Sequence, residues 1–145
     1  MKTLEYNIQL NQPSEKVWDC LWQIDNYKKW TRPFSEGTYY KTSDFKQGNK
    51  IHFLLPDGNG MYSTIEVLII NKLVIFNHIG EIKNFEEQPL DEKTKQWTNA
   101  KESYELVETT YGTNLNIKVD CADEYIEYMN TAFLLAIEEI KKLAS

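Results

Sequence analysis

The last part of the chain, residues 123–144, constrains the fold most strongly because it reads as one long amphipathic helix. Its apolar residues recur on an arc of about 140°, the width typical of a helix packed against a sheet. Asp120 or Asp123 is expected to cap its start, and Lys141 and Lys142 stand at its end, as the helix dipole favours. At about 1.5 Å per residue the helix reaches about 30 Å. It must therefore cover a large apolar surface.

Charge and hydropathy exclude several classes of partner. The chain of 145 residues has a net charge of −6 and no run of basic residues, which excludes a nucleic-acid or anionic-membrane binding protein. No apolar run reaches the roughly 18 residues of a membrane span, and the N-terminus has no apolar signal-peptide core. We therefore expect one domain over residues 1–145, located in the cytoplasm.

Alternating apolar and polar residues predict a strand over 4–10, followed by a helix that begins near Pro13 and a second short helix over 27–30. Further strands are predicted over 37–42, 50–55, 61–70, 73–79, 100–108 and 113–119. Tight turns join most of them, so the sheet must be antiparallel. Residues 81–99 break the pattern and predict a long excursion with a short helical turn around 90–95. The long C-terminal helix is the one predicted element long enough to cover the apolar face of this sheet.

Several short motifs resemble a known superfamily. They are residues 13–18 and 27–30 in the two short helices, 45–50 with Asn49 in place of the second Gly of "F-x-x-G-G-x", 57–58, 66–76, 102–104 and 112–115. This pattern resembles the START-like (SRPBCC, helix-grip) superfamily and, within it, the family of activator of heat-shock protein 90 ATPase homologues. The resemblance implies an α+β helix-grip fold, in which a curved antiparallel sheet of about six to seven strands wraps one long C-terminal helix and two short helices follow the first strand.

The resemblance also implies a deep cavity between the sheet and the first half of the long helix. Relatives bind lipids, plant hormones or polyketides there, and a few carry out cyclase or hydrolase chemistry. The named activity, stimulation of a chaperone ATPase, belongs to larger eukaryotic relatives with an additional N-terminal domain.

Histidines and cysteines offer little for catalysis or metal binding. His52 and His78 both fall inside predicted strands, and an inward His78 could donate a hydrogen bond to a ligand or accept a proton near neutral pH. The alternative is that His78 has a structural role only, with its ring nitrogens hydrogen-bonded to a neighbouring residue of the protein. Cys20 and Cys121 lie far apart and are expected to be buried free thiols. We assign no catalytic residue, metal site or cofactor, because the sequence has neither a nucleophile elbow nor zinc spacing.

Two carboxylates could be buried. Glu66 interrupts an apolar run and Glu102 precedes Tyr104, although Glu66 is expected on the outer face of the sheet. Burial raises the pKa of a carboxyl group, so an inward Glu would be a candidate functional residue.

Aromatic residues make up 13% of the chain and suit a small-molecule site with an apolar wall, although such rings can equally fill a core. Trp30, Phe34 and the excursion over 81–99 are expected to frame the mouth of the cavity. The residues predicted to bind a ligand are Trp30, Phe34, Phe53, Phe76, His78, Tyr104, Tyr125, Met129 and Phe133.

The leading hypothesis is a binding domain, non-enzymatic or at most weakly catalytic, for a small hydrophobic or aromatic molecule. One alternative is a co-chaperone-like regulator of a heat-shock protein 90 ATPase that acts through protein contact. Leu134 and Leu135 lie outside the main apolar arc and could serve such a contact or a homodimer. The other alternative is a cyclase or hydrolase that uses His78 or a buried Glu. The identity of the ligand stays open.

Overall fold

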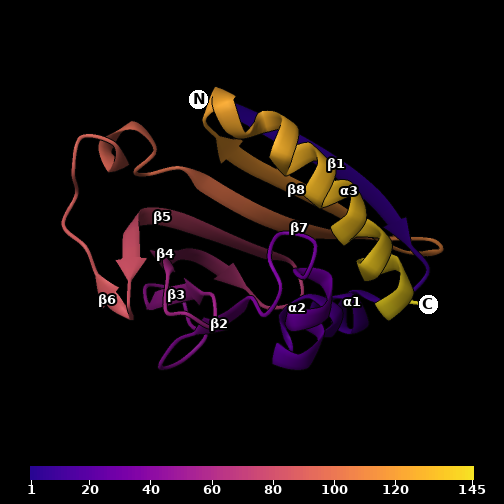
Figure 1. Ribbon diagram of the computed structural model, residues 1–145. Coiled ribbons are helices and arrows are strands. Elements are labelled where there is room, and N and C mark those ends of the chain that lie inside the picture. The colour runs from indigo at the N-terminus through magenta and orange to yellow at the C-terminus, as the bar shows by residue number, and fades with distance from the viewer.

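The computed structural model describes all residues from 1 to 145 and shows one antiparallel sheet, two short helices and one long helix (Figure 1). The elements are β1 (Lys2–Leu10), α1 (Ser14–Trp22), α2 (Ile24–Trp30), β2 (Tyr39–Lys41), β3 (Lys50–Leu54), β4 (Gly60–Ile69), β5 (Leu73–Lys83), β6 (Glu86–Glu87), the 3₁₀ turn η1 (Thr94–Gln96), β7 (Lys101–Thr109), β8 (Gly112–Cys121), the 3₁₀ turn η2 (Asp123–Tyr125) and α3 (Ile126–Leu143).

The sheet runs in the order β1-β8-β7-β5-β4-β3-β2, with all neighbours antiparallel, and the two-residue β6 pairs with the end of β5. Tight turns join β4 to β5 and β7 to β8, and Asn71 takes a positive φ of 68° in the first of them. This arrangement confirms the predicted α+β helix-grip fold, with β6 added to the seven strands of the main path.

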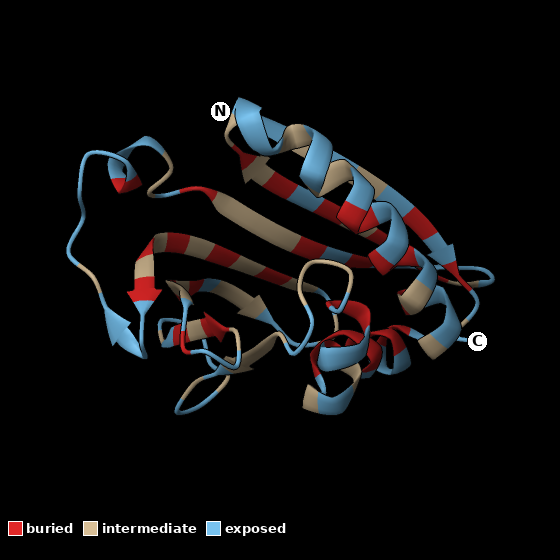
Figure 2. Cartoon of the chain, viewed as in Figure 1, coloured by how far each residue is buried: buried red, intermediate tan, exposed pale blue.

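The long helix α3 is amphipathic, as predicted. Its buried side chains lie on one face, and Figure 2 shows that they concentrate beyond its first turns. They are Ala132, Phe133, Ala136, Ile137 and Ile140. The predicted acidic cap is wrong: no side chain caps α3, and the Asp120 carboxylate instead accepts hydrogen bonds from the Thr3 hydroxyl and the Lys101 N–H. Asp120 thereby ties β8 to both neighbouring strands.

The two short helices cover the sheet together with α3, so the expectation that α3 alone covers it is wrong. The Trp22 ring of α1 lies 4.9 Å from the Tyr104 ring and 5.4 Å from the Phe76 ring, centroid to centroid. The Trp30 ring nitrogen of α2 donates a hydrogen bond of 2.8 Å to the Leu21 carbonyl oxygen. Both helices lie beside the C-terminal half of α3, where the Cys20 thiol contacts the Leu143 carbonyl oxygen (Figure 1).

The predicted excursion over 81–99 is present, but its first part continues the sheet. β5 extends to Lys83, the chain reverses at Asn84 and Phe85, which both have positive φ, and β6 returns along β5. The predicted helical turn is η1, slightly later than expected. The Thr98 hydroxyl donates to the Ile79 carbonyl oxygen at 2.7 Å, so the end of the excursion is fastened to β5.

None of the helices combines the length and the hydropathy that crossing a membrane would require.

Candidate ligand-binding cavity

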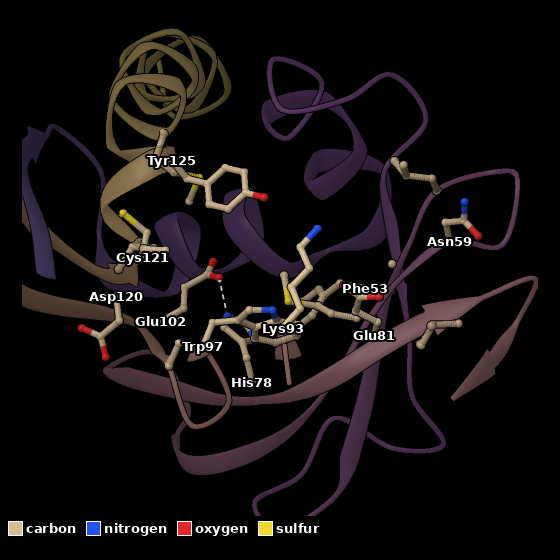
Figure 3. Close-up of a pocket in the computed structure, with 18 of the residues that line it drawn as sticks. Phe53, Asn59, His78, Glu81, Lys93, Trp97, Glu102, Asp120, Cys121 and Tyr125 are labelled. Atoms are coloured by element: carbon tan, nitrogen blue, oxygen red, sulfur yellow. Dashed lines mark hydrogen bonds and ion pairs between the residues drawn. The ribbon is translucent and has the colours of Figure 1, made fainter. Parts of the chain in front are cut away.

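A cavity of about 740 Å³ lies between the start of α3 and the end of the sheet to which β3, β4 and β5 contribute (Figure 3). Twenty-four residues line it, and 12 of them are hydrophobic. The excursion over 81–99 forms one side and η2 forms another. Only η2 and the beginning of α3 cover the sheet here, since α1 and α2 lie over its other part.

Aromatic and aliphatic side chains form the walls. Phe53 comes from β3, Met61 from β4, Trp97 from the residues after η1, and Tyr125 and Met129 from η2 and α3. Tyr125 is about half exposed, at 47%, and its ring points into the space between α3 and the excursion (Figure 3). Rings around an apolar space can stack on a flat ligand or meet it edge to face.

A chain of hydrogen bonds forms the polar floor. The Ser63 hydroxyl lies 2.6 Å from Nδ1 of His78, and Nε2 of His78 lies 3.0 Å from Oε1 of Glu102. The Tyr104 hydroxyl donates to the other oxygen of Glu102. Ser63 and Tyr104 are fully buried, whereas His78 and Glu102 line the cavity. Two members of this hydrogen-bonded chain therefore face the cavity, and the two others hold them from behind.

An irregularity in β5 brings Ser63 opposite His78. Tyr62 pairs with Gly80 but Ser63 pairs with His78, so Ile79 is an extra residue in β5 and forms a β-bulge. Bulges re-aim side chains and are common beside functional sites. The His78 N–H donates to the Ala100 carbonyl oxygen at 2.9 Å, which fixes the strand against the start of β7.

The Glu102 side chain lies on the same face of β7 as the buried residues Tyr104 and Leu106, so strand alternation alone turns it inward. Burial raises the pKa of Glu102, but the hydrogen bonds and charge of His78 and the hydrogen bond from Tyr104 outweigh burial and leave that pKa lowered. Burial, and then the charge of Glu102, raises the pKa of Tyr104 well above its ordinary value. At neutral pH the floor therefore presents a carboxylate supported by a protonated phenol.

Four of the nine residues predicted to bind a ligand line the cavity, namely Phe53, His78, Tyr125 and Met129. The other five do not line it and belong to the packed interior: Trp30, Phe34, Phe76, Tyr104 and Phe133. The prediction that Trp30 and Phe34 frame the mouth is wrong, because Trp30 is 2% exposed and Phe34 packs against Phe133 at 4.7 Å between ring centroids. For these rings, core packing was the correct alternative.

The excursion does frame the cavity, through Lys83, Lys93, Gln96 and Trp97. The sequence predicted that this segment frames the mouth, but none of these four side chains was among the residues predicted to bind a ligand. It did single out Glu102 and His78, but separately, without their contact. Glu66 lies outside, as expected, and its carboxylate pairs with Lys101 at 2.6 Å.

Groups that could hold a metal ion are absent: no three side chains of His, Cys, Asp or Glu gather suitably. Cys20 and Cys121 are both free and buried, as expected, and Cys121 contributes to the cavity wall.

No family model matches the sequence, and no curated protein matches it. Solved structures do match. The Aha1 dimer from Colwellia psychrerythraea is 20% identical with a TM-score of 0.71, over 99% of this chain and 96% of that one. A protein from Chromobacterium violaceum is 16% identical with a TM-score of 0.68, over 99% and 98%. DynU16, from the dynemicin biosynthetic locus, is 10% identical with a TM-score of 0.67, over 98% of this chain and 46% of that one.

These structures define the class of protein by its architecture: the chain has the START-like, helix-grip fold. The resemblance seen in the sequence motifs is confirmed at the level of the fold, with an Aha1 homologue among the structural neighbours. At 10–20% identity the likeness carries the fold alone.

Proposed function

We propose that this protein binds a small, largely apolar or aromatic molecule in the cavity under the start of α3. The observation that carries the proposal is a space of about 740 Å³ with aromatic walls and a floor of two convergent polar side chains. Ligand sites typically measure about 300–1,000 Å³ and combine apolar walls with a few polar groups that orient the ligand.

A thermal-shift screen of lipids and aromatic compounds tests the proposal. A ligand at a hundred times its Kd stabilises the folded state by about 2.7 kcal/mol. For a chain of this size that free energy raises Tm by roughly 5–10 °C. A library without any such shift would contradict the proposal.

A matched pair of variants tests whether the ligand binds in this cavity. Met129→Trp puts a bulky ring into the cavity wall, and Leu135→Trp makes a similar change on the exposed outer face of α3. We expect the ligand-induced shift to vanish in the first variant and to persist in the second. A full shift in Met129→Trp would locate the ligand elsewhere.

A second candidate function is cyclase or hydrolase chemistry in the same cavity. The contact between His78 and Glu102 favours it, since an imidazole and a carboxylate that face a ligand can exchange protons with it. His78→Asn should then abolish turnover of any substrate found by screening, while the circular dichroism spectrum stays unchanged. Unchanged turnover would rule out His78.

A third candidate function is protein contact, including regulation of a heat-shock protein 90 ATPase or formation of a homodimer. Leu134 and Leu135 are 62% and 55% exposed on α3, away from its buried face. This candidate predicts stimulation of the host chaperone's ATPase that is lost in Leu134→Glu, or a concentration-dependent sedimentation coefficient. Absence of both effects would count against it.

A further inference from the structure

The Glu102 carboxylate has spare acceptor capacity that faces the cavity. An ionised carboxylate accepts about four hydrogen bonds. Two are supplied from within the protein, by Nε2 of His78 at 3.0 Å and by the Tyr104 hydroxyl. Because the carboxylate only accepts, the proton between His78 and Glu102 belongs to Nε2. The remaining lone pairs are left for a group that enters the cavity.

Donors on the floor, in contrast, are already used. Nε2 of His78 and the Tyr104 hydroxyl both donate to Glu102, and Nδ1 of His78 faces the fully buried Ser63. Figure 3 shows the Glu102 carboxylate reaching toward the centre of the lined space, with Asp120 turned away from it. A ligand that reaches the floor therefore meets an acceptor and finds no free donor.

Four kinds of ligand head group would interact differently with this floor. A carboxylate needs donors and would meet the Glu102 oxygens with like charge. An ether cannot donate, so it leaves the remaining lone pairs of the Glu102 carboxylate without a donor. A primary ammonium brings three donors to a floor with one acceptor group, and the aromatic wall formed by Phe53, Trp97 and Tyr125 cannot satisfy the other two donors. A hydroxyl group brings a single donor, and a free lone pair of the Glu102 carboxylate can accept it.

We propose that the cavity selects flat aromatic molecules that carry one hydroxyl group, and that this hydroxyl donates its proton in a hydrogen bond to Glu102 while the rings lie between Phe53, Trp97 and Tyr125. This inference rests on the proposed function, because it names the ligand class of the same site. A site that hydrogen-bonds a ligand hydroxyl rejects the capped analogue, and with a charged acceptor the difference in Kd is roughly tenfold to a hundredfold.

The test is a series of compounds with one ring system, namely 2-naphthol, 2-methoxynaphthalene, 2-naphthoate and 2-naphthylmethylamine. Dissociation constants are measured by calorimetry on the intact protein at pH 7. We expect 2-naphthol to bind at least tenfold more tightly than each of the other three. The wild-type series is decisive even where a variant fails to fold.

Glu102→Gln sharpens the result because it keeps the shape and removes the charge. We expect the preference for 2-naphthol over its methyl ether to fall to about threefold or less. Glu105→Gln is the matched control, since Glu105 lies on the same strand with its side chain exposed on the other face. The control should keep the full preference.

The outcomes separate the two proposals. Equal binding of 2-naphthol and its ether overturns the hydroxyl inference and leaves the binding function standing. Tightest binding of 2-naphthoate also overturns the inference and assigns the head group to the cavity-lining Lys83 or Lys93. Tightest binding of the amine overturns it in favour of a cation. If calorimetry detects no binding of any of the four compounds, the hydroxyl inference is overturned as well. If the thermal-shift screen of the broad library also finds no ligand, the proposed function is overturned too.

Discussion

The two halves of α3 cover the same sheet but enclose opposite environments. Beyond Ala132 the helix packs with α1 and α2, and Ala136 and Ile140 are fully buried. At its start, Tyr125 is half exposed and Met129 lines a cavity of about 740 Å³. Three helices share the sheet at one end, and α3 with η2 stands alone at the other. The cavity therefore results from where α1 and α2 end, rather than from any special feature of α3.

Polar groups differ between the two ends in the same way. At the packed end, the Trp30 ring nitrogen donates to the Leu21 carbonyl oxygen and has no further role. At the cavity end, Ser63, His78, Glu102 and Tyr104 form a connected chain in which Glu102 is the shared acceptor and lines the cavity. Polar groups that are satisfied internally stabilise a fold, whereas an acceptor with free lone pairs at a cavity is available to a ligand.

The largest expected difference between the ends is in stability. Trp30→Ala removes a buried ring from the packed end and should lower the free energy of unfolding by about 3–5 kcal/mol. Tyr125→Ala, at the cavity mouth, should change it by less than about 1 kcal/mol. Urea denaturation measures both. A similar loss in the two variants would show that the cavity end is packed as tightly as the other.

The second effect is the pH dependence of the floor. Glu102→Gln should lower stability at pH 7 by about 1–3 kcal/mol, because it removes a hydrogen-bonded buried carboxylate. The pKa of Glu102 is lowered in the folded state, so its contribution is present above the unfolded pKa of about 4.3 and is lost as pH falls through the folded value. The gap between wild type and variant should therefore close in acid. A gap that is constant from pH 7 to pH 3 would contradict the lowered pKa.

The third and smaller effect concerns the group behind the histidine. Ser63→Ala leaves Nδ1 of His78 without its partner and should cost about 1 kcal/mol. Ser103→Ala is the control, because Ser103 lies on β7 with its side chain on the face opposite Tyr104. That control should stay within about 0.5 kcal/mol of wild type. Equal losses of stability in the two variants would mean that the hydrogen bond between Ser63 and His78 does not contribute to stability.

The sequence predicted what depends on local periodicity. Alternation in β1 and the apolar arc of α3 are properties of neighbouring residues, so both elements and the fold class were predictable. The contact of His78 with Glu102 was not predictable, because it depends on the register of β5 against β7, in which Phe76 lies opposite Glu102. An inward residue in each strand was visible, but their contact is non-local.

Aromatic residues show the other limit of prediction. Trp30 and Tyr125 are both large rings on helical segments, yet one is buried in the core and the other faces the cavity. Composition cannot separate them, since the difference lies in whether a second helix packs nearby. Trp97 was missed as a wall residue because the excursion has no periodicity from which an orientation follows.

The smallest expected effect on stability lies at the excursion, whose return strand β6 pairs with β5 and is joined to β3 by one side chain, that of Glu87. The Glu87 carboxylate lies 2.9 Å from Nζ of Lys50 and 2.8 Å from Nε2 of His52, both on β3. Burial opposes ionisation of Glu87, but the hydrogen bonds and charges of His52 and Lys50 together outweigh it, and the pKa of Glu87 is lowered. All three groups are partly exposed, so solvent screens them and Glu87→Gln should cost less than about 1 kcal/mol.

The same substitution should have a clear local effect because these contacts join β6 to β3. We expect faster hydrogen–deuterium exchange over residues 84–99 in Glu87→Gln and unchanged exchange in α1 and α3. Glu86→Gln is the matched control, since the neighbouring carboxylate forms no ion pair. The lowered pKa means that the contact holds above the unfolded pKa of Glu87 and weakens as pH falls, so wild type and variant should converge in acid. Equal exchange in the two variants at neutral pH would mean that the contacts of Glu87 with β3 do not hold the excursion, and that its other bonds, such as the one from the Thr98 hydroxyl, are enough.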